Sequence, residues 1–243
     1  MFVEAVMGAG GAMVPPKGYF QAITPMLDKY GIFLVDDEVI CGFGRTGNAF
    51  GCQTYSFQPD SMSIAKALSS AYLPISAVLL NEQVFQGLVK ESEKIGTFAH
   101  GYTYSAHPVA AAVAIETLKI YEERNILEHV RRVAPRLQNG LRKFADHPLV
   151  GEVRGVGLIA GIELVKDKAT KESFDVKLGV GPYLVKQCQA RGLILRAMAG
   201  DHIGFCPPLI VNEGEIDAIL ERFGKALDDT LAWVRQNGHA KAA

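Results

Sequence analysis

The chain has 243 residues, of which 49% are hydrophobic and 21% are charged, a composition typical of a globular protein with one large domain or two smaller ones. Its formal net charge of −1 argues against binding nucleic acid or an anionic membrane through bulk charge. No apolar run reaches transmembrane length, and the N-terminal residues lack the basic and apolar regions of a signal peptide. We therefore expect neither a nucleic-acid partner nor a membrane partner.

The cysteines and histidines point to a reducing compartment without a metal centre. Cys41, Cys52, Cys188 and Cys206 are scattered, with no C-x-x-C spacing. Such thiols are typical of a reduced cytoplasmic protein, so we expect a cytoplasmic localisation. None of the six histidines has a partner at zinc-ligand spacing, and we assign no metal ligand.

Strands and helices alternate in the first half of the chain. We expect strands at residues 2–6, 32–35 and 76–80, and helices at residues 19–30, 83–94 and 108–123. The run at residues 32–35 is short, apolar and followed by acids, which is typical of a parallel strand buried on both faces. A glycine-rich loop follows it. This half is predicted to be α/β.

The pattern changes after about residue 124. We expect helices at residues 126–144, 180–191 and 213–235, the last capped by Asn212, a strand pair within 150–165, and strands at 193–195 and 202–205. This order predicts an α+β domain. We therefore divide the chain into residues 1–123 and residues 124–243.

Three acids and one lysine stand at the ends of expected strands. Asp36, Asp37 and Glu38 follow the run at 32–35, and Lys66 follows the apolar stretch 62–65. Parallel α/β sheets place ligands at the carboxyl ends of their strands, so these groups would converge on one crevice. A lysine there can form a Schiff base with pyridoxal phosphate (PLP), and an acid can keep the pyridine nitrogen protonated. Alternatively, the acids cap a loop and the lysine is solvated.

Several motifs carry a family resemblance. The segment VDDEVICGFGRTG at residues 35–47 resembles the D-E-V-x-x-G-F-G-R-T-G signature of class III aminotransferases, of the ω-amino acid:pyruvate type, and SIAKAL at 63–68 resembles their lysine motif. The segments FVEAVMGAGGAMVPPKGY, HGYTYSAHP and RGVGLIAGIE resemble further motifs of that family, in the same order. The resemblance covers nearly the whole chain and implies fold type I of the PLP-dependent transferases. Residues 1–123 would be the C-terminal part of the large PLP-binding domain, and residues 124–243 the small α+β domain.

The resemblance also implies site residues. Lys66 would be the catalytic lysine that holds PLP and transfers a proton. Asp37 would pair with the pyridinium nitrogen, and Val39 would pack against the ring. Thr103 would bind the phosphate, often across a dimer interface in this family, which implies a homodimer with a shared active site. Tyr102 would line the partner's substrate channel.

Two further residues would contact the substrate. The resemblance implies that Arg196, which we place at the end of the strand at 193–195, clamps a substrate carboxylate through its guanidinium fork. Glu4 would pair with this arginine when no carboxylate is bound. Alternatively, Arg196 forms a surface or interdomain ion pair and Glu4 is a buried structural acid.

The chain lacks elements that lie upstream in the family. Class III enzymes are close to twice this length, and neither their phosphate-binding loop nor their ring-stacking aromatic residue is recognisable here. We therefore expect a chain truncated at its N-terminus. Its first strand would be an unpaired edge, and a large hydrophobic surface would be exposed.

Three functions stay open. The first is transamination from an amine or ω-amino acid to pyruvate or another 2-oxo acid. The second is an aminomutase or racemase that uses the same lysine and aspartate, although Arg196 slightly favours transamination because it suits alternating substrates. The third is an inactive fragment without the phosphate-binding loop.

Overall fold

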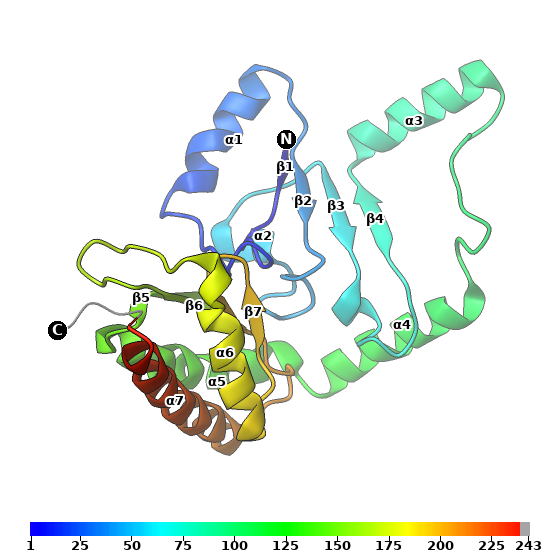
Figure 1. The fold of residues 1–243 in the computed structure, drawn as a ribbon. Coiled ribbons are helices and arrows are strands. Elements are labelled where there is room, and N and C mark those ends of the chain that lie inside the picture. Colours follow the sequence, from blue (N-terminus) through cyan, green and yellow to red (C-terminus); the bar gives the residue numbers. More distant parts are fainter. Residues whose placement is uncertain (239–243) are drawn as a thin grey trace. The chain divides into compact units, whose positions relative to one another are not determined.

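The computed structural model describes residues 1–238, and these form two compact units (Figure 1). The first unit comprises residues 1–5 and 15–127, and the second comprises residues 6–14 together with the chain from residue 128 onward. A short N-terminal segment therefore belongs to the unit that is otherwise built from the C-terminal half. No helix among the described residues is long and apolar enough to cross a membrane.

The first unit contains a four-stranded sheet with the order β1-β2-β3-β4. Its strands are β1 (Phe2–Val3), β2 (Val35–Asp37), β3 (Ser61–Ile64) and β4 (Ala77–Leu80). The first three run parallel, and β4 pairs antiparallel with β3. Its helices are α1 (Tyr19–Lys29), α2 (Gly51–Tyr55), the 3-10 turn η1 (Lys66–Leu68), α3 (Glu82–Ile95) and α4 (Pro108–Glu123). As expected, β1 lies at an edge of the sheet.

The expected strand at 32–35 begins three residues late. The amide of Ile32 donates to the carbonyl of Leu27 at 2.9 Å, so this residue closes the end of α1. Pairing with β3 begins only at Val35, and the strand therefore contains both aspartates. Side chains alternate along a strand, and here Asp36 is buried whereas Asp37 is exposed.

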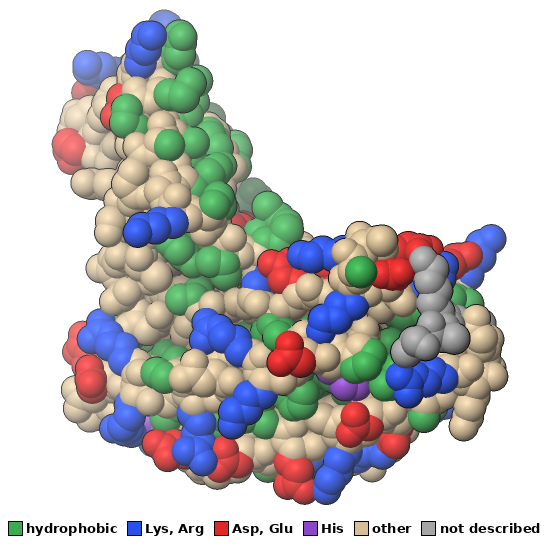
Figure 2. Space-filling view, turned by 90° about the vertical axis from the view of Figure 1, so that its left-hand side faces the viewer, with side chains coloured by type: hydrophobic (Ala, Val, Ile, Leu, Met, Phe, Trp, Pro, Cys, Tyr) green, Lys and Arg blue, Asp and Glu red, His purple; other side chains and the backbone are tan. Residues whose placement is uncertain are grey.

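The first unit exposes much hydrophobic surface, as expected from the sequence. All four residues of β4 are exposed, and α3 has no buried residue. Phe2 of β1 is 83% exposed. Figure 2 shows hydrophobic side chains gathered in a band along the upper part of one face. An apolar groove in this unit is lined mainly by Leu80, Phe85, Leu88 and Phe98.

The second unit contains an antiparallel sheet with the order β5-β6-β8-β7. Its strands are β5 (Val150–Val156), β6 (Ile159–Leu164), β7 (Arg196–Met198) and β8 (His202–Phe205), and its helices are α5 (Ile126–Arg142), η2 (Lys143–Asp146), η3 (Val176–Leu178), α6 (Val180–Ala190) and α7 (Glu213–Gln236). The rings of Phe205 on β8 and Phe223 on α7 meet edge to face at 5.0 Å in the core. Asn212 caps α7 as expected: its side chain accepts from the Glu215 amide at 2.9 Å, and Glu215 accepts in return.

The expected strand at 193–195 is wrong. The amide of Leu193 donates to the carbonyl of Cys188 at 3.0 Å and closes the end of α6. The strand begins instead at Arg196, which pairs with Gly204 of β8. Arg196 is therefore the first residue of a strand and not the residue that ends one.

Candidate active site

The carboxyl ends of β1, β2 and β3 meet at one edge of the first sheet. Val3 pairs with Asp36, and Asp37 pairs with Ser63. Glu4 follows β1 directly, Asp37 ends β2, and Lys66 lies two residues beyond the end of β3. The parallel pairing therefore brings these acids and the lysine to the same sheet edge, the position at which α/β folds bind ligands.

Lys66 has an unusual backbone conformation. Its φ angle is 45°, in the left-handed region that residues other than glycine rarely adopt. The conformation turns the chain out of β3 into η1, where the Leu68 amide donates to the Ala65 carbonyl at 3.0 Å. The Tyr121 hydroxyl of α4 donates to the Ala67 carbonyl at 2.8 Å and holds this turn. Backbone strain of this kind costs about 1–2 kcal/mol and is concentrated at functional sites.

Asp37 and Val39 lie at the exposed end of β2. One carboxylate oxygen of Asp37, Oδ1, accepts from the Val39 amide at 3.0 Å, which fixes the turn after the strand. The carboxylate is exposed and Val39 is half-buried. Asp37 is thus available to a cationic group, and Val39 provides an apolar surface beside it.

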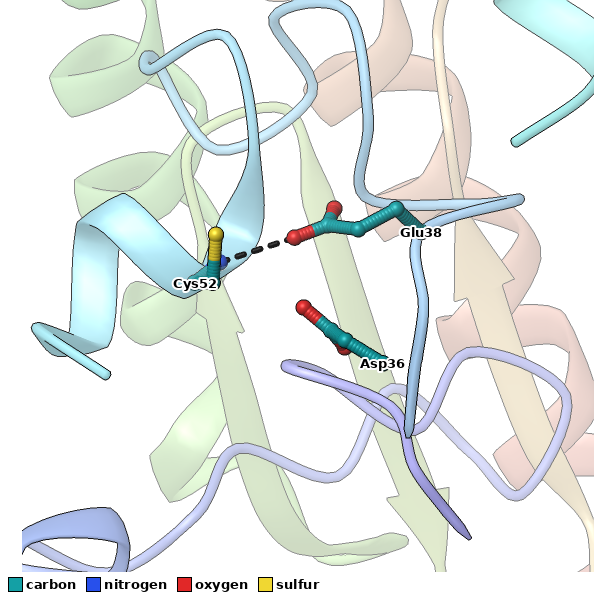
Figure 3. Close-up of side chains that lie close together, drawn as sticks. All are labelled: Asp36, Glu38 and Cys52. Atoms are coloured by element: carbon teal, nitrogen blue, oxygen red, sulfur yellow. Dashed lines mark hydrogen bonds between the residues drawn. The ribbon is translucent and has the colours of Figure 1, made fainter. Parts of the chain in front are cut away.

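Asp36 and Glu38 flank Asp37 and point to the opposite side, into the protein. Both are fully buried. In Figure 3 their carboxyl groups are directed toward the beginning of α2, where Glu38 Oε1 accepts from the Cys52 amide at 2.8 Å. One oxygen of each carboxyl group and the sulfur of Cys52 lie within 4.8 Å of one another. The sequence motif contains these acids, but we did not predict from it that Asp36 and Glu38 turn inward together. The alternation of side chains along a strand was the signal that could have revealed it.

The glycine-rich loop allows this close packing. A Cβ atom on Gly51, the first residue of α2, would lie 2.5 Å from the Cβ of Ala5 and 3.3 Å from Glu38 Oε1. Any side chain there would push α2 away from the carboxyl groups. Gly51 thus allows the Cys52 amide to reach Glu38.

Thr103 and Tyr102 lie in the segment between α3 and α4. Both are exposed, and the exposed fraction of Tyr102 is 78%. The Tyr102 amide donates to Ser105 Oγ at 3.0 Å and stabilises a turn around Thr103. These two residues are not part of the sheet edge that carries Lys66.

Arg196 belongs to the second unit, where it is exposed at the start of β7. Glu4 is half-buried in the first unit. The structure gives each of the two residues a defined place in its own unit.

Two family-like motifs meet inside the second unit. Arg154 of β5 donates from Nε to the carbonyl of Gly11 at 2.8 Å, and its Nη1 donates to Glu163 at 2.9 Å. Its Nη2 lies 3.0 Å from Nδ1 of His202. The segment at 6–14 is thus attached to the sheet of this unit by a side chain that is only 10% exposed.

Comparison with known proteins gives one consistent result. Residues 1–227 match the model of the family Aminotransferase class-III. Gamma aminobutyrate transaminase 3, chloroplastic, of Solanum lycopersicum is 50% identical over 227 residues, which are 93% of this chain and 44% of that protein. Vanillin aminotransferase of Capsicum chinense is 46% identical over 93% of this chain and 49% of its own length.

Solved structures agree with the sequence comparison. A structure described as a transaminase with L-ala is 51% identical, with a TM-score of 0.93 over 96% of this chain and 55% of its own. The omega transaminase of Pseudomonas jessenii in complex with PMP is 51% identical, with a TM-score of 0.92 over 96% of this chain and 51% of its own. The chain spans about half the length of these relatives, and its architecture is the fold type I of the PLP-dependent transaminases. The family inferred from the motifs is confirmed: this chain belongs to the class III aminotransferases.

Proposed function

We propose that the protein to which this chain corresponds is a PLP-dependent transaminase that moves an amino group from an amine or ω-amino acid to pyruvate or another 2-oxo acid. The observation that carries the proposal is the placement of Lys66 and Asp37 at one sheet edge of a class III aminotransferase chain. Relatives named as γ-aminobutyrate and vanillin aminotransferases support an amine or ω-amino acid donor.

The residues at this edge fit PLP. An exposed lysine amine in a strained turn and an exposed carboxylate at a neighbouring strand end are the donor set that the cofactor needs. Lys66 would hold PLP, Asp37 would pair with its ring nitrogen, and Val39 would support the ring. When bound, PLP supplies an aldehyde for amine capture and a ring that withdraws electrons from the substrate Cα.

The remaining roles follow from what each residue can do. The amine of Lys66 would act as the acid–base group that moves a proton at the substrate Cα. Arg196 would hold a substrate carboxylate by paired hydrogen bonds, and Glu4 would be its partner in the absence of that carboxylate. This arginine favours transamination over an aminomutase or racemase reaction.

We also propose a homodimer. Thr103 and Tyr102 are exposed in a segment separate from the sheet edge, so they are available to a partner's cofactor phosphate and substrate channel. The exposed β4 and α3 offer the hydrophobic surface that an obligate interface requires. The half of the relatives' length that this chain does not span is a second candidate for covering that surface.

Two further assignments accompany the proposal. Residues 1–123 would belong to the large PLP-binding domain and residues 124–243 to the small domain. The division into compact units supports a boundary near residue 127, whereas residues 6–14 group with the second unit. Among the described residues the four cysteines form no disulfide, and three of them are buried, which supports a cytoplasmic location, although several plant relatives are named as chloroplastic or mitochondrial.

A visible spectrum tests the proposal. Purified chain is mixed with PLP, and the absorbance band of the bound cofactor is followed with Lys66→Ala as the control. The proposal expects a Lys66-dependent band that an amine donor bleaches and pyruvate restores. A band of equal strength in both proteins would refute the role of Lys66. If no band forms with the chain alone, the same comparison is made with a full-length protein that contains this chain, and absence there refutes PLP binding.

A further inference from the structure

We propose that Asp36 and Glu38 share one proton, with Asp36 as the hydrogen-bond donor to Glu38, and that this pair is the device that positions Asp37. The shared proton is inferred from this chain alone. Its consequence for the cofactor partner Asp37 rests on the proposed function.

The carboxyl groups of Asp36 and Glu38 are buried with too few hydrogen-bond donors around them. Asp36 and Glu38 have no exposed surface. Among the residues that the structure describes, both oxygens of Asp36 and Oε2 of Glu38 have no hydrogen-bond partner. An ionised carboxylate buried without donors is too costly to persist, and such groups take up a proton instead. A proton on Asp36 makes it a donor to the carboxyl group of Glu38, which lies beside it in Figure 3.

The surrounding charges favour the same outcome. Burial first, and then the neighbouring acids Glu38, Asp37 and Glu4, together raise the pKa of Asp36 to about 9. The pKa of the Cys52 thiol is raised to about 12 by burial and by Glu38 and Asp36, so the thiol stays protonated.

Glu38 connects three parts of the candidate site. Its side chain accepts from the Cys52 amide at 2.8 Å, and its own amide donates to the Ser63 carbonyl of β3 at 2.9 Å. Its carbonyl accepts from the Gly42 amide at 2.8 Å, at the start of the glycine-rich loop. A second negative charge at Asp36 would push Glu38 away from these partners. Asp37 lies between the two acids, so its direction depends on both.

A metal cation bound by Asp36, Glu38 and Cys52 is the alternative to a shared proton. Two carboxyl oxygens and one sulfur within 4.8 Å could also hold a metal ion. That arrangement requires the Cys52 thiol to lose its proton, whereas a shared proton satisfies the pair without a further ligand. We therefore assign a shared proton, and not a metal ion, to Asp36 and Glu38. The metal content of the purified protein is measured separately and distinguishes the two.

Infrared spectroscopy tests for the proton directly. At about pH 7 the folded chain should show a carboxylic-acid C=O band that shifts when aspartate is carboxyl-labelled and is lost in Asp36→Asn. Asn can still donate to Glu38, so this variant keeps the fold, and circular dichroism checks that it does. Asp201→Asn is the matched control, because Asp201 is also buried and its pKa is also raised by burial. Absence of the band, or a stoichiometric divalent metal that Asp36→Asn releases, would overturn the proposal.

Hydrogen exchange tests positioning without any cofactor. Corrected for the intrinsic rate, protection of the Val39 and Cys52 amides should fall above about pH 9 in the natural sequence and persist in Asp36→Asn. With PLP bound, the Lys66-dependent band should likewise change above about pH 9 in the natural sequence and stay unchanged in Asp36→Asn. Identical pH profiles of exchange in the two proteins would refute positioning. Failure of the PLP band alone would count against the proposed function and leave the proton assignment standing.

Discussion

The Nε of Arg154 donates a hydrogen bond to the carbonyl oxygen of Gly11, 143 residues earlier in the chain, at a distance of 2.8 Å. This bond joins the segment after β1 to the antiparallel sheet of the second unit. Arg154 also contacts Glu152 at 2.8 Å and Glu163 at 2.9 Å, so one buried cation orders several elements.

Arg154→Ala should lower the free energy of unfolding by about 3 kcal/mol, because it leaves Glu163 and the Gly11 carbonyl without their buried donor. Urea unfolding measures the change. Arg136→Ala is the control, since Arg136 also pairs with an acid, Asp217, but on an exposed surface where such pairs contribute little. Equal losses in the two variants would contradict the structural role of Arg154.

Gly161→Ala should destabilise the second unit by about 1–3 kcal/mol. A Cβ atom at this position would lie 2.4 Å from the Gly11 carbonyl oxygen, and backbone atoms cannot move aside as a flexible side chain can. Gly87→Ala, in α3 with open space around it, should instead be neutral or stabilising by up to about 1 kcal/mol. Thermal unfolding of both variants gives the comparison, and a neutral Gly161→Ala would refute the close approach.

Asp36→Asn should remove a pH dependence of stability. With a folded pKa of about 9 and an ordinary value of 3.8, the folded chain retains this proton where the unfolded chain releases it. Stability is therefore lost as pH rises between these values, by up to about 1.4 kcal/mol per pH unit. The free energy of unfolding of Asp36→Asn should therefore exceed that of the natural sequence by an amount that grows as the pH rises from about 4 to about 9. Urea titrations at several pH values measure it, and a constant difference between the two proteins would contradict the raised pKa.

Lys66→Gly should be more stable than Lys66→Ala by about 1 kcal/mol, because only glycine adopts a φ of 45° without strain. Both variants should lose the PLP band. At Lys90, in the exposed middle of α3, the order should reverse, since glycine is the poorer helix former. The same order at both positions would show that Lys66 carries no strain.

Asn212→Ala should cost about 1 kcal/mol, because it removes the side chain that caps α7 through the Glu215 amide. Asn139→Ala, on the exposed surface of α5, should change the unfolding midpoint little. A loss of equal size at both sites would mean that the cap adds nothing beyond an ordinary surface contact.

Local patterns predicted most of the elements. The helix at 108–123 and the strand at 202–205 have the bounds expected from the sequence, and α7 begins at its expected cap. Both displaced strands, at 32–35 and at 193–195, have the same cause. In each, the first apolar residue closes the preceding helix through a backbone bond and begins no strand. Hydrophobicity alone does not distinguish the two uses of an apolar residue.

The motifs identified the family and pointed to candidate site residues, but they did not predict the surroundings of those residues. The sequence VDDEV alone does not predict which of its acidic residues is buried. That depends on the register of β2 against β3, which sets Asp37 outward and Asp36 inward. The strained turn at Lys66 and the contact of Arg154 with Gly11 likewise arise from pairing between distant segments.

The assignment of residues 6–14 to the second unit has a consequence for engineering. The polypeptide passes between the units three times, after residues 5, 14 and 127, so the second unit is not a continuous cassette. A gene cut after residue 123 would express a C-terminal piece whose Arg154 has lost its Gly11 acceptor. Exchange of this unit between relatives would therefore require two grafts, one for the short insert and one for the long C-terminal stretch.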